Sequence, residues 1–206
     1  LASTPSYNGA YAITPEIDID SISRLRVRFN ASVGNYYTSQ YASELIVAVL
    51  TDPNDLSSQT DIDTIKIYGG EDLQYEVRFD EYIGDYDDVY GRYVMFVSYS
   101  NKSNVVFIDD VVFDTIPTCV APKVRELTNT PNRLVLNLYG GGESYQAKYV
   151  IGNYAQDAFD VAPIHNVSDG NLEINGLEQN TACYVMVRSA CGSDYSDWSP
   201  VMRFTT

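Results

Sequence analysis

Short runs in which apolar and polar residues alternate constrain the fold of this chain more than any other feature. Alternation is clear in residues 25–29 and 75–79, and nearly continuous apolar runs occupy residues 45–50 and 93–99. Successive side chains of a strand point to opposite faces, so alternation predicts strands with one solvent face, and continuous apolar runs predict strands buried on both faces. Turn-forming residues separate the runs, and helical periodicity is almost absent. The pattern predicts an all-β protein built from sandwiches or barrels.

A domain boundary is expected between Ile116 and Pro117. Two prolines, Pro117 and Pro122, lie close together there, and proline-rich segments commonly link domains. The charge also changes at this point. Residues 1–116 contain 7 Lys and Arg against 19 Asp and Glu, whereas residues 117–206 contain 6 against 9. The sequence therefore predicts two domains, residues 1–116 and residues 117–206.

The acidity of the chain argues against several functions. The net charge is −15, and a surface this acidic repels phosphate backbones, which argues against nucleic-acid binding. Anionic membranes are disfavoured for the same reason. No apolar run is long enough to cross a bilayer, so we expect no membrane insertion by this chain. The sequence does not begin with a basic and then apolar stretch, and we expect any signal peptide or lipid anchor to have been removed.

The second domain resembles a fibronectin type III module. Residues 177–192 resemble the late strand of these modules, and residues 196–206, which contain Trp198, resemble their closing strand. The resemblance covers all of residues 117–206 and implies an immunoglobulin-like sandwich of seven strands. The strands are expected at residues 123–127, 133–139, 145–151, 159–161, 172–174, 182–190 and 201–205.

Cys183 departs from the fibronectin type III pattern. The family usually has a tyrosine six residues after the leucine that corresponds to Leu177, and this position is Cys183. Strand alternation places Cys183 with Val185 and Val187 toward the core, and Tyr184, Met186 and Arg188 outward. We interpret Cys183 as a small buried apolar residue. A reactive thiol is the alternative.

Cys119 and Cys191 are predicted to form a disulfide. In the fibronectin modules of secreted Bacteroidetes proteins, which this domain resembles, a cysteine before the first strand recurs with one in this late position. Such a bridge would close a loop of about 70 residues and stabilise the fold by about 4 kcal/mol in the chain-entropy treatment. The alternative is three free thiols in a reducing compartment.

The first domain resembles the MAM-like and gingipain cleaved-adhesin jelly rolls of Bacteroidetes surface proteins. Residues 11–18, 25–29 and 46–55 are similar to the front part of these jelly rolls, and residues 105–111 are similar to their closing strand. Members are usually longer at the front, so the opening strand is expected to be absent or replaced by residues 1–10. The resemblance also implies a structural calcium ion near the end of the closing strand, with Asp109 or Asp110 as ligand.

Tyrosines in expected loops of the first domain are candidate binding residues. Exposed aromatic rings stack on sugars and anchor protein interfaces. Residues 80–90 combine such rings with acidic groups, as a glycan-binding loop could. The alternative is that the tyrosines pack the edge of the sandwich. The candidates are Tyr36, Tyr37, Tyr82, Tyr86 and Tyr90.

No catalytic constellation can be argued from the sequence. The only histidine, His165, lies in a turn-like stretch without a nucleophile motif. Acidic pairs are numerous, but glycosidases need two carboxyl groups in a defined geometry. We therefore expect no enzymatic activity.

Three functions are compatible with the sequence. The first is a secreted or cell-surface binding and adhesion protein that recognises a glycan or an extracellular or host protein through the first domain. The second is an accessory region of a larger secreted hydrolase, a glycosidase or peptidase. The third is a structural component of a surface assembly.

Overall fold

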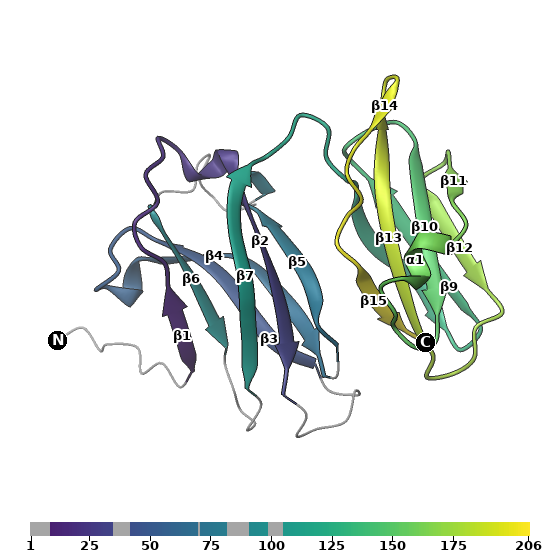
Figure 1. Cartoon of the computed structure of the whole chain (residues 1–206), viewed down its shortest axis with the longest axis horizontal. Coiled ribbons are helices and arrows are strands. Elements are labelled where there is room, and N and C mark those ends of the chain that lie inside the picture. Colours follow the sequence, from purple (N-terminus) through teal and green to yellow (C-terminus); the bar gives the residue numbers. More distant parts are fainter. Residues whose placement is uncertain (1–8, 35–41, 70, 82–90, 99–104) are drawn as a thin grey trace. The chain divides into compact units, whose positions relative to one another are not determined.

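The chain folds into two compact units, Leu1–Ile116 and Pro117–Thr206, which divide where the sequence places the domain boundary. The computed structural model describes residues 9–34, 42–69, 71–81, 91–98 and 105–206. Nearly all regular structure in these residues is β (Figure 1), so the predicted all-β class is confirmed. No helix among the described residues is long and apolar enough to span a membrane.

Unit 1 contains two antiparallel sheets. One has the strand order β1-β6-β3-β4 and the other has the order β5-β2-β7. Short 3-10 turns lie at Ile22–Arg24, Leu56–Ser58 and Phe79–Glu81. The strands are β1 (Ala10–Ile13), β2 (Leu25–Val33), β3 (Ala42–Leu50), β4 (Gln59–Tyr68), β5 (Leu73–Arg78), β6 (Tyr93–Ser98) and β7 (Val106–Thr115).

The strand order of unit 1 is that of a jelly roll without its opening strand. An eight-stranded jelly roll has sheets ordered 1-8-3-6 and 2-7-4-5. If its first strand is removed and the rest are renumbered, the sheets become 7-2-5 and 1-6-3-4, which are the two sheets of unit 1. The removed strand would have paired with β7. The predicted jelly roll is therefore present, and the described residues lack the opening strand, whereas residues 1–8 lie outside the described part.

The main core of unit 1 fills the space between the two sheets. Phe29 of β2 meets Phe96 of β6 edge to face, with ring centroids 5.1 Å apart. Val47 and Val49 of β3 face the same core, while Ala48 and Leu50 belong to a second apolar cluster with Met95 and Val97 of β6. The continuous apolar runs of β3 and β6 are thus buried on both faces, as their sequences predict.

Unit 2 has the strand order of a fibronectin type III sandwich. Its first, second and fifth strands form the sheet β12-β9-β8, and its third, fourth, sixth and seventh strands form the sheet β11-β10-β13-β15. The short strand β14 pairs with the end of β13. The strands are β8 (Lys123–Thr130), β9 (Arg133–Tyr139), β10 (Tyr145–Ile151), β11 (His165–Val167), β12 (Asn171–Asn175), β13 (Ala182–Cys191), β14 (Asp194–Tyr195) and β15 (Met202–Thr205).

The strand expected at residues 159–161 was wrong. This segment is the single helical turn α1 (Ala158–Val161), and the fourth strand of the unit is β11 instead. The backbone N–H groups of Ala158 and Phe159 donate to the carbonyl oxygens of Ala155 and Gln156, and these bonds form the helical turn. In a strand, Phe159 and Val161 would point to the same face. In the helical turn Phe159 is buried and Val161 is exposed.

Tyr184 faces outward from β13, as predicted, yet it is buried. Cys183, Val185 and Val187 contribute to the core between the sheets, which leaves Tyr184 on the opposite face. The ring of Tyr154 covers Tyr184 there, with ring centroids 5.2 Å apart. The segment between β10 and α1 therefore gives this sheet a second apolar layer.

Candidate functional site

The five tyrosines predicted to bind a ligand lie outside the described residues. Tyr36 and Tyr37 fall in residues 35–41, and Tyr82, Tyr86 and Tyr90 fall in residues 82–90. The glycan-binding loop therefore stays a prediction. The described surface of unit 1 offers a different candidate, which is the free edge of β7.

Strand β7 pairs with β2 on one side and with no described strand on the other. Gly34 donates a backbone hydrogen bond to Val105, and Ile116 donates one to Arg24. Residues of an antiparallel strand alternately direct their N–H and C=O groups to one neighbour and then to the other. Counting from these two bonds along the pairs with β2, the backbone groups of Val106, Ile108, Phe113 and Thr115 point to the free edge.

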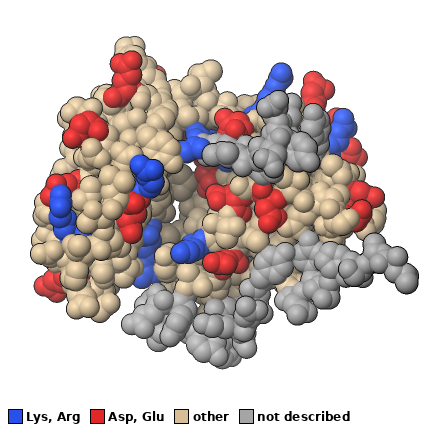
Figure 2. All heavy atoms as spheres, turned by 180° about the vertical axis from the view of Figure 1, so that it is seen from behind, with Lys and Arg blue, Asp and Glu red and all other residues tan. Residues whose placement is uncertain are grey.

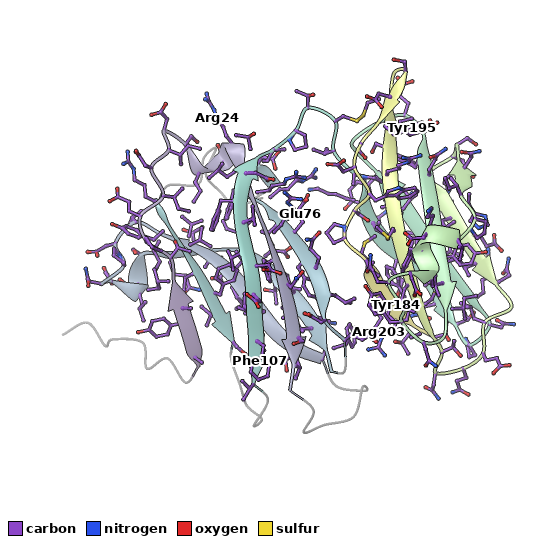
Figure 3. All side chains as sticks on the ribbon, in the orientation of Figure 1. Arg24, Glu76, Phe107, Tyr184, Tyr195 and Arg203 are labelled. Atoms are coloured by element: carbon purple, nitrogen blue, oxygen red, sulfur yellow. A yellow bond between two sulfur atoms is a disulfide. The ribbon has the colours of Figure 1, made fainter. Side chains whose placement is uncertain are left out.

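The outward side of β7 carries exposed apolar residues together with the acidic residues Asp109 and Asp114. Phe107 is 57% exposed, and Val105, Val111 and Val112 are also exposed. Figure 3 shows Phe107 at one end of the strand. The inward side chains of Val106, Ile108 and Phe113 pack against the core but are only half-buried. The edge therefore leaves apolar groups uncovered on both faces of the sheet.

The other edge strand of the same sheet, β5, has a different pattern of exposed and buried residues. Its inward residues Leu73 and Val77 are buried, and Phe79, which follows it, is buried as well. Its outward residues Gln74, Glu76 and Arg78 are polar, and the inward Tyr75 between Leu73 and Val77 is half-buried and stacks on Phe29. Charged side chains and β-bulges are among the features by which natural sheets limit pairing at an edge, and β7 has both in its acidic bulge. The β7 edge thus differs from the β5 edge in its exposed apolar residues, which include Phe107 and Val112.

Strand β1 of the facing sheet shows the same incomplete cover. Ala12 is directly opposite Phe96 in the β1–β6 pair, so both side chains point to the same face of the sheet. Phe96 is in the core, yet Ala12 and its neighbour on that face, Ala10, are exposed. Figure 1 shows β1 at the level of the Val106 end of β7. An opening strand, which the described residues do not include, would cover this position.

A bulge with two acidic residues interrupts β7. Asp110 and Val111 lie opposite the single residue Phe29, and Asp110 has a φ of 51°. Asn30 donates a hydrogen bond to Asp110 at 3.0 Å, and the backbone N–H of Asp110 donates to the Asp109 carboxylate at 2.8 Å. The bulge divides the edge into a half before Asp110 and a half after Val111.

The described residues do not bring a calcium site together at Asp109 and Asp110. Calcium takes six to eight oxygen ligands. No group of three or more His, Cys, Asp or Glu side chains suited to a metal ion occurs among the described residues. The calcium ion therefore stays a prediction, and the effect of EDTA on the melting temperature tests it.

An ion cluster lies on the outer face of β2 and its neighbours. Arg26 donates to Asp114 at 2.7 Å and to Glu76 at 3.0 Å, and Arg28 also donates to Asp114. Burial favours a higher pKa for Asp114, but the hydrogen bonds and charges of the two arginines outweigh it and lower the pKa. Figure 2 shows Lys and Arg scattered over the described surface of one face, without a gathered basic patch.

The predicted disulfide and the buried thiol are both present in unit 2. Cys119 and Cys191 are bonded, with their Cα atoms 6.1 Å apart. Cys183 is a free, fully buried cysteine in the core. Burial raises the pKa of the Cys183 thiol to about 12, so the thiol is neutral at physiological pH. The interpretation of Cys183 as an apolar core residue is confirmed.

A stack of cationic and aromatic side chains lies on the outer face of β10 and β13. The Arg188 guanidinium is 4.3 Å from the Tyr195 ring centre and 4.5 Å from the Trp198 ring centre. The Lys148 Nζ atom also lies over Trp198, 5.5 Å from the ring centre. Arg188 also donates two hydrogen bonds to Gln146. These contacts are internal to unit 2 and hold the segment after β14 against the sheet.

Comparisons with known proteins do not assign this chain to a family. No model of a known protein family matches the sequence, and no curated protein matches it. Solved structures that resemble the chain include the fn3 domain of human collagen alpha-1(XX) chain, with 19% identity over 42% of this chain and 83% of that chain and a TM-score of 0.35. The chicken CNTN1 FN1-FN3 domains share 17% identity over 80% of this chain and 54% of that chain, also with a TM-score of 0.35. The FN5 domain of Drosophila Lar shares 11% identity over 42% and 92%, with a TM-score of 0.33. Because these scores are low, the assignment of unit 2 rests on its strand order.

Sequence reasoning missed both the β7 edge and the Arg188 stack. The apolar residues of β7 are visible in the sequence, but only the strand order shows that one side of this strand has no described neighbour. The stack had a weak signal, which is a tryptophan and a tyrosine shortly after a strand that contains an outward arginine. His165, expected in a turn, lies in β11 and stacks on Tyr149 with ring centroids 4.7 Å apart.

Proposed function

We propose that this chain is a non-enzymatic extracellular binding module that recognises another protein through the β7 face of unit 1. The observation that carries the proposal is the exposed apolar surface of β7, which includes Phe107 and Val112. Apolar patches that stay exposed on a folded domain commonly mark protein interaction sites.

The disulfide supports an extracellular location. Disulfides such as Cys119–Cys191 persist in oxidising compartments and are rare in the cytosol. The fibronectin-type strand order of unit 2 suits a spacer or adhesion module. Secretion or display at a cell surface is therefore the location that we propose.

The described surface favours a protein over a glycan as ligand. Sugar recognition relies on exposed aromatic rings together with polar groups. The exposed groups of β7 are mostly aliphatic, and Phe107 is its only exposed aromatic ring. Aliphatic and aromatic anchors inside a polar rim are typical of protein interfaces.

Purified extracellular proteins and glycans, screened side by side with the whole chain, test the proposal. We expect protein ligands whose binding is lost in the double variant Phe107→Ser/Val112→Ser. The control is Tyr139→Ser/Ile151→Ser, which removes two exposed apolar residues from unit 2 and should leave binding unchanged. Ligands confined to the glycan set, an absence of any ligand, or equal binding by both double variants would overturn the proposal.

A further inference from the structure

The free edge of β7 lies where an eight-stranded jelly roll has its opening strand. That strand would pair with β7 in one sheet and would lie across from β1 in the other. Both positions are incompletely covered. Val106 and Ile108 of β7 are half-buried. Ala10 and Ala12 of β1 are exposed, although they lie on the same face of their sheet as the buried Phe96. Two observations on different strands thus point to one unfilled position.

The half of the edge before the bulge is suited to pairing with an extended strand. Val106 and Ile108 direct their N–H and C=O groups outward there, and Phe107 and Asp109 bond to β2. A strand bound along this half would bond to Val106 and Ile108, and its inward side chains would cover Ala10 and Ala12. Main-chain bonds of this kind supply affinity, and the alternating side chains supply specificity.

Charge identifies what kind of strand fits. Asp109 and Asp110 are exposed beside the edge, and residues 1–116 carry a net charge of −12. A partner strand should therefore carry apolar side chains at the inward positions and basic side chains at the outward positions. Opposite charges directly across a pair of strands are stabilising, and like charges are destabilising.

Two other occupants fit less well. A second copy pairing β7 with β7 would bring two acidic units together, and their Asp109 and Asp110 groups would repel. Residues 1–9 contain one large aliphatic side chain, Leu1, and also Pro5, which has no N–H group to donate.

We infer that β7 receives an extended strand from another polypeptide, apolar on its inner face and basic on its outer face, which completes the jelly roll by strand addition. This inference rests on the proposed function and names the partner class for the same face. It predicts binding of linear segments, whereas the proposed function requires only that some protein binds there.

A library of random linear twelve-residue peptides displayed on phage tests the inference, with the whole chain as bait. We expect enriched peptides in which apolar residues alternate with Lys or Arg. Ile108→Pro removes an outward N–H group from the β7 edge without removing a bond to β2, and it should weaken the enriched peptides by about tenfold or more. The matched control, Gln74→Pro, places a proline at the free edge of β5 and should leave their binding unchanged.

Amide exchange gives a second readout that does not depend on a variant. On binding an enriched peptide, the amides of Val106 and Ile108 should become protected, while those of Phe107 and Asp109 should change little. No enrichment above background, equal binding by the Ile108→Pro and Gln74→Pro variants, or protection without this alternation would overturn the inference. Protection of Val106 and Ile108 already in the free chain would also overturn it. If folded proteins still bind in a Phe107-dependent manner, only strand addition fails and the proposed function stands.

Discussion

Cys119, just before β8, is bonded to Cys191, the last residue of β13, across a sequence separation of 72 residues. The bond ties the start of unit 2 to the end of its longest strand. Cys191 also lies 3.5 Å from the carbonyl oxygen of Gly141, which has a φ of 73°. A side chain at Gly141 would collide with Ser189 and Val120, so glycine permits the close approach of these segments.

Replacing both bonded cysteines should destabilise unit 2. A loop of this length contributes about 4 kcal/mol in the chain-entropy treatment, so we expect the Cys119→Ser/Cys191→Ser variant to lose about 2–4 kcal/mol. Trp198 is the only tryptophan, so its fluorescence during urea unfolding reports unit 2. Reduction of the wild-type protein should give the same shift and add about 2 Da of mass. An unchanged tryptophan transition in both experiments would contradict a stabilising bond.

The Cys183 thiol should be unreactive in the folded protein. Because burial raises its pKa to about 12, the thiolate that maleimide or disulfide reagents attack is scarce at neutral pH. The folded state keeps its proton at pH values where the unfolded thiol, with a pKa of about 8.5, has lost it. The contribution of Cys183 to stability is therefore present below about pH 8.5 and decreases as the pH rises toward 12.

Alkylation kinetics and alkaline unfolding measure these effects. We expect no labelling of native protein at pH 7 and complete labelling of one thiol in urea. Cys183→Ala should remove the labelling and should flatten the alkaline loss of stability. Rapid labelling of the native protein would show that Cys183 is accessible, against its burial.

Neutralising Asp114 should weaken unit 1. Its carboxylate bonds with Arg26 and Arg28, so Asp114→Asn leaves two partly buried guanidinium groups with weaker partners. The pair is part-exposed, so we expect a loss of about 1 kcal/mol. The lowered pKa of Asp114 means that its contribution is present above about pH 4, the pKa of an unfolded aspartate, and is lost as the pH falls further.

Urea unfolding of unit 1, followed by tyrosine fluorescence or circular dichroism between pH 7 and pH 2, tests this effect. Asp18→Asn is the matched control, because Asp18 is exposed and its side chain makes no hydrogen bond or ion pair within the described residues. The Asp114→Asn protein should lose less stability on acidification than the control protein. An equal loss of stability on acidification in the two variants would show that the ion cluster does not stabilise unit 1.

Removing the cation from the stack on β13 should destabilise unit 2 modestly. Arg188→Ala removes contacts with Tyr195 and Trp198 and the hydrogen bonds to Gln146, and we expect a cost of about 1–2 kcal/mol. Arg125→Ala, at an exposed position on β8, should change stability by less than about 0.5 kcal/mol. Equal melting temperatures for the two variants would show that the stack is not stabilising.

The strands of unit 2 were largely predictable because local pattern and tertiary burial agree there. Residues 133–139 and 145–151 alternate in sequence, and β9 and β10 occupy these same residues. Residues 159–161 failed because Phe159 buries its ring from a helical turn rather than from a strand. A single buried aromatic residue in so short a segment does not distinguish the two conformations.

The candidate site was not predictable from local pattern. Phe107 and Val112 are residue types that also occur in buried strands, so the sequence does not show that they are exposed. Their exposure follows from the position of β7 at the edge of its sheet. Strand order depends on pairings between residues far apart in the chain, such as Ala31 with Ile108. The family resemblance carried one hint, which was the expectation that the opening strand is absent or replaced by residues 1–10.

Hydrogen exchange of the β7 amides in the free chain tests the central claim most directly. If one edge of β7 has no partner strand, the amides of Val106, Ile108, Phe113 and Thr115 exchange rapidly, while those of Phe107, Val112 and Asp114 are protected by β2. This alternation, measured residue by residue by NMR, is the result that an open jelly roll predicts. Uniform protection along β7 would contradict it, because a second strand would then already occupy the edge.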